Sequence, residues 1–263
     1  MYSQTQRKPN EDMEKLIELI PFYKSEELYS NYAAANKPRT ARMINEKINE
    51  KENILIIIET NVGNKFGAYF SKKINIENRF VMDDPNHFVF TLQNNMNIKP
   101  RIYKRRSESI LPLMCLCNDN EEGVILTIPG FCWISDNNSV SFIYRNFGNV
   151  YEDDGDGYAV FCKDEIKMEK KENASIVSIN SIKILQLSLV PQNHRIELST
   201  QLNFNKEKLI DFVASYGKAN VEVGNNFATI VFEHVKEALY FMKSAKHVSN
   251  VFKCSVKIKS VAK

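Results

Sequence analysis

The sequence contains little glycine, proline and cysteine, and it has no long hydrophobic run. Nine Gly and eight Pro among 263 residues, with 43% hydrophobic residues, argue against extensive disorder and indicate a packed core. The longest apolar run, ILIIIE from Ile54, is far shorter than the roughly 20 residues of a membrane-spanning helix, and the N-terminus has no apolar core of signal-peptide type. We therefore expect a soluble intracellular protein, in the nucleus, the cytoplasm or both, without membrane insertion.

Signatures of common enzyme and metal sites are also absent. The cysteines are odd in number and irregularly spaced in apolar contexts, which predicts reduced core thiols, and CLC lacks the spacing of a zinc-binding pair. The histidines are scattered, and there is no GxSxG elbow, phosphate loop or Rossmann fingerprint. We therefore expect no enzyme activity, no metal and no cofactor. The residues concerned are Cys115, Cys117, Cys132, Cys162 and Cys254, and His87, His194, His234 and His247.

Two charged runs leave alternatives open. The run EDDGDG places oxygen ligands at Glu152, Asp154 and Asp156 like the start of a calcium loop, but Lys163 stands where the bidentate acid is required, so a solvated acidic loop is favoured. The run KPRIYKRR, residues 99–106, has five basic residues in eight. It is typical of a nuclear localisation signal or a phosphate-binding edge, and equally of an edge strand protected by charge.

The basic charge is concentrated at the C-terminal end. Residues 192–263 contain 11 Lys/Arg and 6 Asp/Glu, which gives a net charge of +5. Residues 1–191 contain the remaining 24 Lys/Arg and 26 Asp/Glu, which gives a net charge of −2. Such a basic segment indicates an anionic partner, although an excess of Lys is also common on soluble surfaces.

The last 70 residues or so predict six short elements. Alternating apolar residues indicate strands, and a helical stripe between the capping residue Asn205 and the stop at Gly217 indicates the first of two helices. The order strand, helix, strand, strand, helix, strand predicts a ferredoxin-like βαββαβ fold in which both helices cover one face of the sheet. The strands are expected at 195–202, 218–223, 227–233 and 253–259, and the helices at 205–217 and 234–245.

Residues 195–259 resemble the RNA-recognition-motif (RRM) family. LIDFVASYGKANVEV is similar to its first helix and second strand, and NNFATIVFEHVKEALYFM is similar to its third strand and second helix. The octamer of the family falls on residues 225–232, where Phe227 keeps one stacking position and Thr229 replaces another, while Glu197 replaces an aromatic residue of the first strand. Because stacking of a base on an aromatic ring contributes roughly 1–3 kcal/mol, the loss of aromatic residues at positions 229 and 197 implies weak nucleic-acid binding.

The resemblance implies a nucleic-acid site on the open sheet face. Lysines and Arg195 can contact phosphate, and hydroxyl groups can bond to base edges. The leading hypothesis is a non-enzymatic protein that binds single-stranded RNA or DNA, or duplex DNA, and regulates transcription or RNA. The alternative is a protein-interaction adaptor with a degenerate motif whose face or helices bind protein. The predicted site residues are Phe227, Thr229, Ser199, Arg195, Ser255, Lys257 and Lys259.

The first 190 residues predict a two-sheet β-sandwich with flanking helices. Helices are expected at 11–20, 24–35 and 38–52. The strongly apolar run at 53–60 is expected to be a central strand paired in a hairpin with 64–74. Further strands are expected at 86–93, 100–105, 110–117, 123–134, 140–147, 157–163 and 174–189.

This part of the chain resembles the TLDc domain family. The similarity is carried by LYS at 28–30, by ILIIIET with FGAYF at 66–70, and by HFVFTL at 87–92. It continues with the PGFCWI strand, with FGN at 147–149 and with the closing strand INSIKILQL. Members of this family are associated with protection from oxidative stress and with binding of the vacuolar proton pump, so the resemblance implies a protein partner.

The sequence therefore predicts an α+β protein of two domains. Residues 12–190 are expected to form the TLDc-like β-sandwich, and residues 194–263 the ferredoxin-like RRM domain. A short linker is expected around Pro191.

Overall fold

A computed structural model of the chain describes residues 11–32, 39–117, 123–136, 140–153, 155, 157–165, 174–189, 195–200 and 204–257. The chain divides into two compact units, Met1–Leu19 with Ser25–Leu187 and Ile20–Lys24 with Ser188–Lys263. The predicted domain limits of 12–190 and 194–263 stay a prediction. Among the described residues, no helix is long and apolar enough to cross a membrane.

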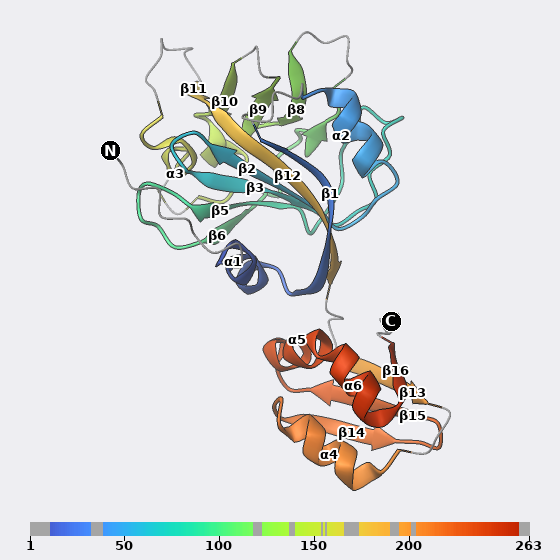
Figure 1. Ribbon diagram of the computed structural model, residues 1–263. Helices are drawn as coiled ribbons and strands as arrows, with labels where there is room; N and C mark the ends of the chain where they lie inside the picture. The colour runs from blue at the N-terminus through green and yellow to red at the C-terminus, as the bar shows by residue number, and fades with distance from the viewer. Residues whose placement is uncertain are drawn as a thin grey trace. The chain divides into compact units, whose positions relative to one another are not determined.

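The first unit contains two six-stranded sheets (Figure 1). The strand order of the first sheet is β1 (Phe22–Tyr32), β12 (Ile179–Leu189), β2 (Ile54–Thr60), β3 (Lys65–Phe70), β5 (Phe88–Gln93) and β6 (Arg101–Lys104). The order of the second sheet is β11 (Ala174–Val177), β10 (Ser141–Tyr144), β9 (Cys132–Ser135), β8 (Val124–Ile128), β7 (Met114–Cys115) and β4 (Phe80–Val81). Side chains from both sheets share one hydrophobic core, as predicted for a sandwich.

Among the described residues, three helices and a 3-10 turn accompany these sheets: α1 (Glu11–Leu19), α2 (Ala41–Ile48), η2 (Phe147–Asn149) and α3 (Ala159–Cys162). The sequence predicts α1 and α2. Thr40 caps α2, because its side chain accepts a hydrogen bond from the amide of Met43, and Ile44 and Ile48 bury the inner side of this helix.

The apolar strand β2 is central, as its composition predicts. It pairs antiparallel with β12 on one side and with β3 on the other. The backbones of β2 and β3 approach so closely at Gly67 that a Cβ atom there would lie 1.8 Å from the carbonyl oxygen of Ile56. Only glycine fits this position of the hairpin.

Aromatic rings fill the centre of the core. The Phe131 ring packs edge-on against Phe66 with centroids 5.6 Å apart and against Phe161 with centroids 4.8 Å apart. Phe147 lies 5.0 Å from Phe161 by the same measure. These residues come from β3, α3, η2 and the turn before β9, so the cluster joins segments that are distant in sequence.

Two predicted elements in this unit have the wrong type. In the expected helix at 24–35, residues 24–32 belong to strand β1, which lies at the edge of the first sheet beside β12, and residues 33–35 lie outside the described residues. An ion pair of 2.8 Å between Lys183 and Glu27 links the two strands. Pairing in the sheet overrides the helical propensity of Glu26, Glu27 and Leu28 in this strand.

The expected strand at 157–163 is instead the short helix α3. Val160 and Phe161 are fully buried in the core. A short apolar run does not distinguish a buried strand from a buried helical turn, which explains this error.

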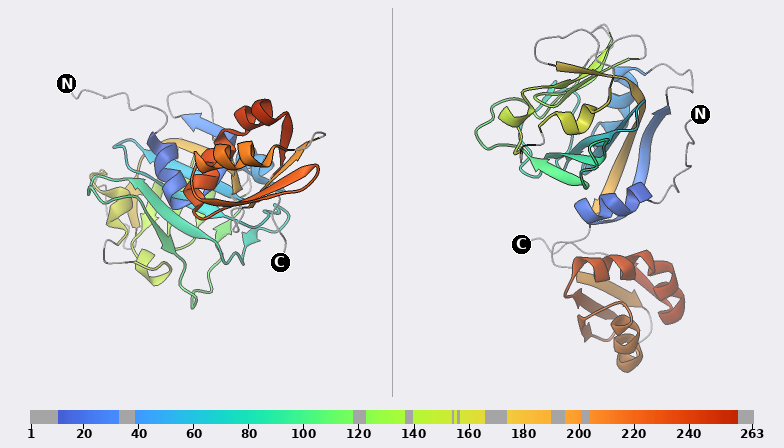
Figure 2. Two further views of the ribbon diagram at one scale, coloured as in Figure 1. Left: turned by 90° about the horizontal axis from the view of Figure 1, so that it is seen from below. Right: turned by 90° about the vertical axis from the view of Figure 1, so that its left-hand side faces the viewer.

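The second unit has the ferredoxin-like order that the sequence predicts. Its elements are β13 (Arg195–Thr200), α4 (Lys206–Ala214), β14 (Ala219–Val223), β15 (Phe227–Phe232), α5 (Val235–Lys243), α6 (Ala245–Phe252) and β16 (Cys254–Lys257). The sheet order is β14-β15-β13-β16, with antiparallel pairing throughout. The helices lie on one face of this sheet (Figures 1 and 2).

Helix α6 is an addition that the sequence analysis missed. Ser244 serves as C-cap of α5 and N-cap of α6, so this single residue separates the two helices. The helix ends at Lys253, which adopts the left-handed conformation with φ of 50°. The buried Val248 fixes its inner side against the unit.

Candidate nucleic-acid interface

The predicted nucleic-acid site lies on the sheet face of the second unit opposite the helices. Phe227 is 53% exposed there. A Cβ atom on Gly224 would lie 2.6 Å from Cε1 of Phe227, so the ring packs against the backbone at Gly224, before the turn into β15. The Phe227 side chain is accessible to solvent as predicted, but part of its ring is covered by the backbone at Gly224.

Thr229 lies on the same face but is only 2% exposed. The expectation of an exposed hydroxyl group at this position is wrong. Thr229 stands directly opposite Glu222 on β14 and Glu197 on β13, so the longer side chains of both neighbouring strands flank a short one on the central strand.

The two predicted serines bind each other. Ser199 and Ser255 are opposite in the register of β13 and β16, and their Oγ atoms are 2.7 Å apart. The Ser255 hydroxyl also donates a hydrogen bond of 3.2 Å to the Ser199 carbonyl oxygen. Base edges would therefore compete with bonds that the strands already make.

The basic residues of the predicted site are placed only by their backbone. Arg195 is opposite Val231, and Lys257 is opposite Glu197. Lys259 lies outside the described residues. The central row of this face therefore reads Glu222, Thr229, Glu197 and Lys257 across the four strands.

The electrostatics of that row do not favour a phosphate backbone. The row contains two acidic residues, Glu222 and Glu197, and one basic residue, Lys257, so its formal charge is −1, whereas nucleic-acid affinity depends on neutralising phosphates with Lys and Arg. One exposed phenylalanine beside two carboxylates provides a single stacking platform in a mixed electrostatic environment.

The basic run at 99–106 is partly engaged in structure. Arg105 donates through Nη2 to the carbonyl oxygen of Ser109 at 2.8 Å and also to that of Leu111, while Nε of Arg106 donates to the Gly148 carbonyl at 2.8 Å. The middle of the run, Arg101–Lys104, forms β6, the edge strand of the first sheet. Its role as a localisation signal stays a prediction.

The described residues of the acidic run EDDGDG form a turn that the Asp153 side chain holds by hydrogen bonds. Asp153 Oδ1 accepts hydrogen bonds from the amides of Gly155 at 3.0 Å and Gly157 at 2.9 Å. Asp154 and Asp156 lie outside the described residues. Within the described ranges, no group of three or more His, Cys, Asp or Glu could hold a metal ion.

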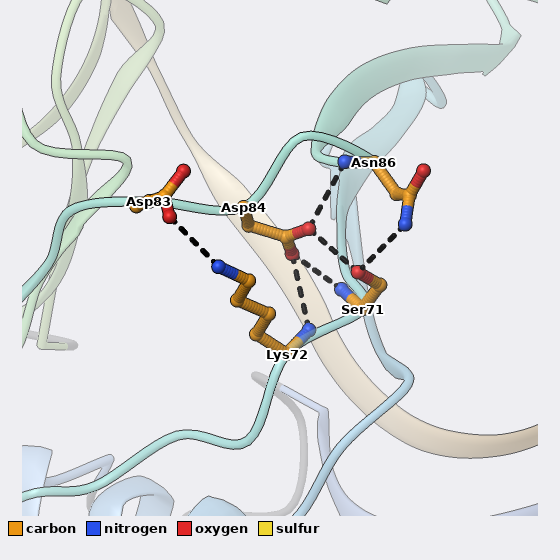
Figure 3. A network of polar contacts seen from close by, with 5 residues as sticks. All are labelled: Ser71, Lys72, Asp83, Asp84 and Asn86. Carbon is orange, nitrogen blue, oxygen red and sulfur yellow. Dashed lines mark hydrogen bonds and ion pairs between the residues drawn. The ribbon is translucent and has the colours of Figure 1, made fainter.

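Asp84 organises a polar network that the sequence analysis missed (Figure 3). This buried carboxylate accepts from the Ser71 amide at 2.5 Å, the Ser71 hydroxyl at 2.6 Å, the Lys72 amide at 3.2 Å and the Asn86 amide at 3.0 Å. Asp83 forms a separate ion pair with Nζ of Lys72 at 2.8 Å. The network joins the end of β3 to the turn before β5, so Asp84 stabilises the fold.

His87 follows this turn and is 3% exposed. Nδ1 lies 2.9 Å from the Tyr69 carbonyl oxygen, and Nε2 lies 3.1 Å from the Tyr151 hydroxyl. A neutral ring that donates from Nδ1 and accepts at Nε2 satisfies both contacts. Burial lowers the pKa of His87 to about 4, so the ring is neutral near pH 7.

The cysteines are free thiols, as predicted. Burial raises the pKa of Cys162 to about 11, and it raises the pKa of the fully buried Cys132 thiol further. Both groups are therefore protonated near neutral pH, which disfavours nucleophilic chemistry.

Comparison with known proteins gives one family. The model of the TLDc domain matches residues 8–179, which is more than half of the chain, and no model of the RNA-recognition motif matches. No curated protein matches the chain.

Proposed function

Since the chain belongs to the TLDc domain family, we propose that it is a non-enzymatic adaptor that acts inside the cell, in the cytoplasm or nucleus, by binding other proteins. The association of the family with the vacuolar proton pump makes that pump the first partner to test, and protection from oxidative stress is the pathway it points to. The weak nucleic-acid character of the sheet face, described above, supports this choice over RNA or DNA binding.

The observation that carries the proposal is an exposed isoleucine held on a fixed loop. Ile110 is 90% exposed, between β6 and β7 of the TLDc-family unit. Arg105 donates to the carbonyl oxygens of Ser109 and Leu111, on either side of Ile110, and so restrains the loop from within. A large apolar side chain fixed in water loses little further conformational entropy when it binds.

Other exposed apolar side chains accompany this loop. Phe80 and Met82, on and after β4, are 50% and 55% exposed. The Leu113 amide donates to the Val81 carbonyl at 2.7 Å, which ties the end of the loop to β4. We call Phe80, Met82, Ile110 and Leu111 the apolar ridge. Several exposed apolar residues in connected segments are typical of a protein-binding surface.

The test is complex formation between the full-length chain and the purified vacuolar proton pump, followed by size-exclusion chromatography. We expect the wild type to co-elute with the pump at a fixed ratio. Because a central apolar residue can contribute 2 kcal/mol or more, roughly a 30-fold change in affinity, Ile110→Asp should abolish co-elution at micromolar concentration.

The matched control is Ile210→Asp. Ile210 is another exposed isoleucine, but it lies on α4 of the second unit, so this variant should co-elute like the wild type. No complex with the wild type, or equal binding by Ile110→Asp and the wild type, would count against the proposal.

A further inference from the structure

The C-terminal segment of the chain carries charge of one sign. Residues 238–263 contain six Lys, one His and no Asp or Glu, whereas the rest of the chain contains 29 Lys/Arg and 32 Asp/Glu. The described part of this segment forms the end of α5, helix α6 and strand β16. The net positive charge of the second unit is therefore concentrated on and after its last helices.

The basic side chains that this segment places on and directly after the two helices are exposed. Lys243, Lys246, His247 and Lys253 are all exposed, and Tyr240 is 62% exposed. Lys246 lies on α6, and Lys253 is the C-cap residue that directly follows this helix. We call these five residues the basic helical surface. It lies on the helical side of the unit, away from the sheet face.

The lysines of this surface have no acidic partners in the part of the chain that the structure describes. Four lysines elsewhere, Lys72, Lys73, Lys183 and Lys218, form ion pairs, whereas Lys243, Lys246 and Lys253 form none there. The acid nearest in sequence is Glu237 at the start of α5, and it accepts from the His234 amide at 3.3 Å as part of a capping box. Helix α4 adds no net charge, because it contains two Lys and two acidic residues.

Two aromatic rings lie beside this charge, each with a lysine ammonium group near it, and Tyr240 remains largely exposed. Nζ of Lys243 lies 6.0 Å above the Tyr240 ring, and Nζ of Lys208 lies 5.8 Å above the Phe252 ring. Phe252 also meets Phe212 edge-on, with centroids 5.2 Å apart. Single-stranded nucleic acid stacks successive bases on several aromatic rings, whereas Tyr240 is the one phenylalanine, tyrosine or tryptophan among the five residues of this surface; carboxylates need only the ammonium groups.

We propose that the basic helical surface binds an acidic segment of a partner protein, with carboxylates on the lysines and an apolar side chain against Tyr240. The proposal does not depend on the apolar ridge, since it concerns the other unit. Among the described lysines of the segment, Lys243 and Lys246 lie on the helices and Lys253 directly follows α6, whereas Lys257 lies on β16 of the sheet.

The test measures fluorescence anisotropy of labelled poly-L-glutamate with the full-length chain. Wild-type binding should weaken as salt is raised, because exposed charges are screened. The variant Lys243→Glu/Lys246→Glu/Lys253→Glu should bind at least about ten-fold more weakly, since three attractive contacts become repulsive.

The matched control makes the same change in net charge elsewhere. Lys47, Lys72 and Lys163 are exposed in the first unit outside the basic run 99–106, and Lys47→Glu/Lys72→Glu/Lys163→Glu should stay within about two-fold of the wild type. If the triple variant of the helical surface does not fold, Lys243→Gln/Lys246→Gln/Lys253→Gln replaces it, with a loss of at least about four-fold expected.

Three results would overturn the proposal. The first is binding by the helical-surface variant within two-fold of the wild type, and the second is an equal loss in the control variant. The third is a single-stranded oligonucleotide of equal charge that binds more tightly than poly-L-glutamate through the same lysines, since the occupant would then be nucleic acid.

Discussion

At the residue scale, two buried polar side chains that resemble functional groups, Asp84 and His87, have structural partners. Asp84 accepts four hydrogen bonds and holds two turns together, and His87 packs with its ring 4.7 Å from Phe70. The sequence shows both residues but not their neighbours. Only the fold reveals that these polar groups are structural, because their partners are backbone atoms or distant side chains.

His87 should make stability fall in mild acid. Its pKa is about 4 in the folded chain and roughly 6.5 when unfolded, so the unfolded chain takes up the proton first as the pH falls. This contribution is complete above about pH 7 and decreases between about pH 6.5 and 4, by about 2 kcal/mol from pH 7 to 4.5. Urea denaturation at these two pH values measures it.

The variant His87→Asn separates this effect from carboxylate titration. It should be less stable at pH 7, but its loss between pH 7 and 4.5 should be about 2 kcal/mol smaller than that of the wild type. An equal loss in both proteins would show that His87 does not carry this pH dependence.

At the scale of elements, the sequence predicts hydrophobic periodicity well and tertiary pairing poorly. The central strand β2, the capped helix α2 and the βαββαβ order of the second unit are all confirmed. Strand β1 and helix α3 were mistaken because their type depends on what they pack against, β12 and the aromatic core. Helix α6 was missed because Ser244 joins it to α5 without a proline or glycine signal.

In the candidate site, too, the sequence predicts what depends on periodicity and misses what depends on pairing between strands. The alternation in β15 correctly places Phe227 on the exposed face. The burial of Thr229 could not be read from β15 alone, because it results from Glu222 and Glu197 on the adjacent strands. Register between strands, not periodicity within one, decides which residues of a sheet face reach solvent.

The pairing of β2 with β3 should depend on Gly67. In Gly67→Ala, the new Cβ atom would overlap the Ile56 carbonyl oxygen, so the strands must separate and the free energy of unfolding should fall by roughly 3 kcal/mol or more. In Gly148→Ala the nearest atom would be at 3.4 Å, and the loss should stay below about 1 kcal/mol. Thermal or urea denaturation of both variants tests this, and equal stability would contradict the close approach.

At the scale of the whole molecule, the chain combines a TLDc-family unit with a smaller ferredoxin-like unit. The TLDc resemblance is confirmed by the family match over residues 8–179, whereas membership of the RRM family is not supported. The first unit presents the apolar ridge and the second presents the basic helical surface. Two surfaces of different chemistry on separate units are what an adaptor requires to join two proteins.

Hydrogen exchange of the full-length chain, with and without the vacuolar proton pump, tests the central claim most directly. We predict slower exchange in peptides that cover residues 105–113, where Arg105 holds Ile110 in place, and unchanged exchange in β15 around Phe227. Unchanged exchange at 105–113, or protection confined to β15, would contradict protein binding through the apolar ridge.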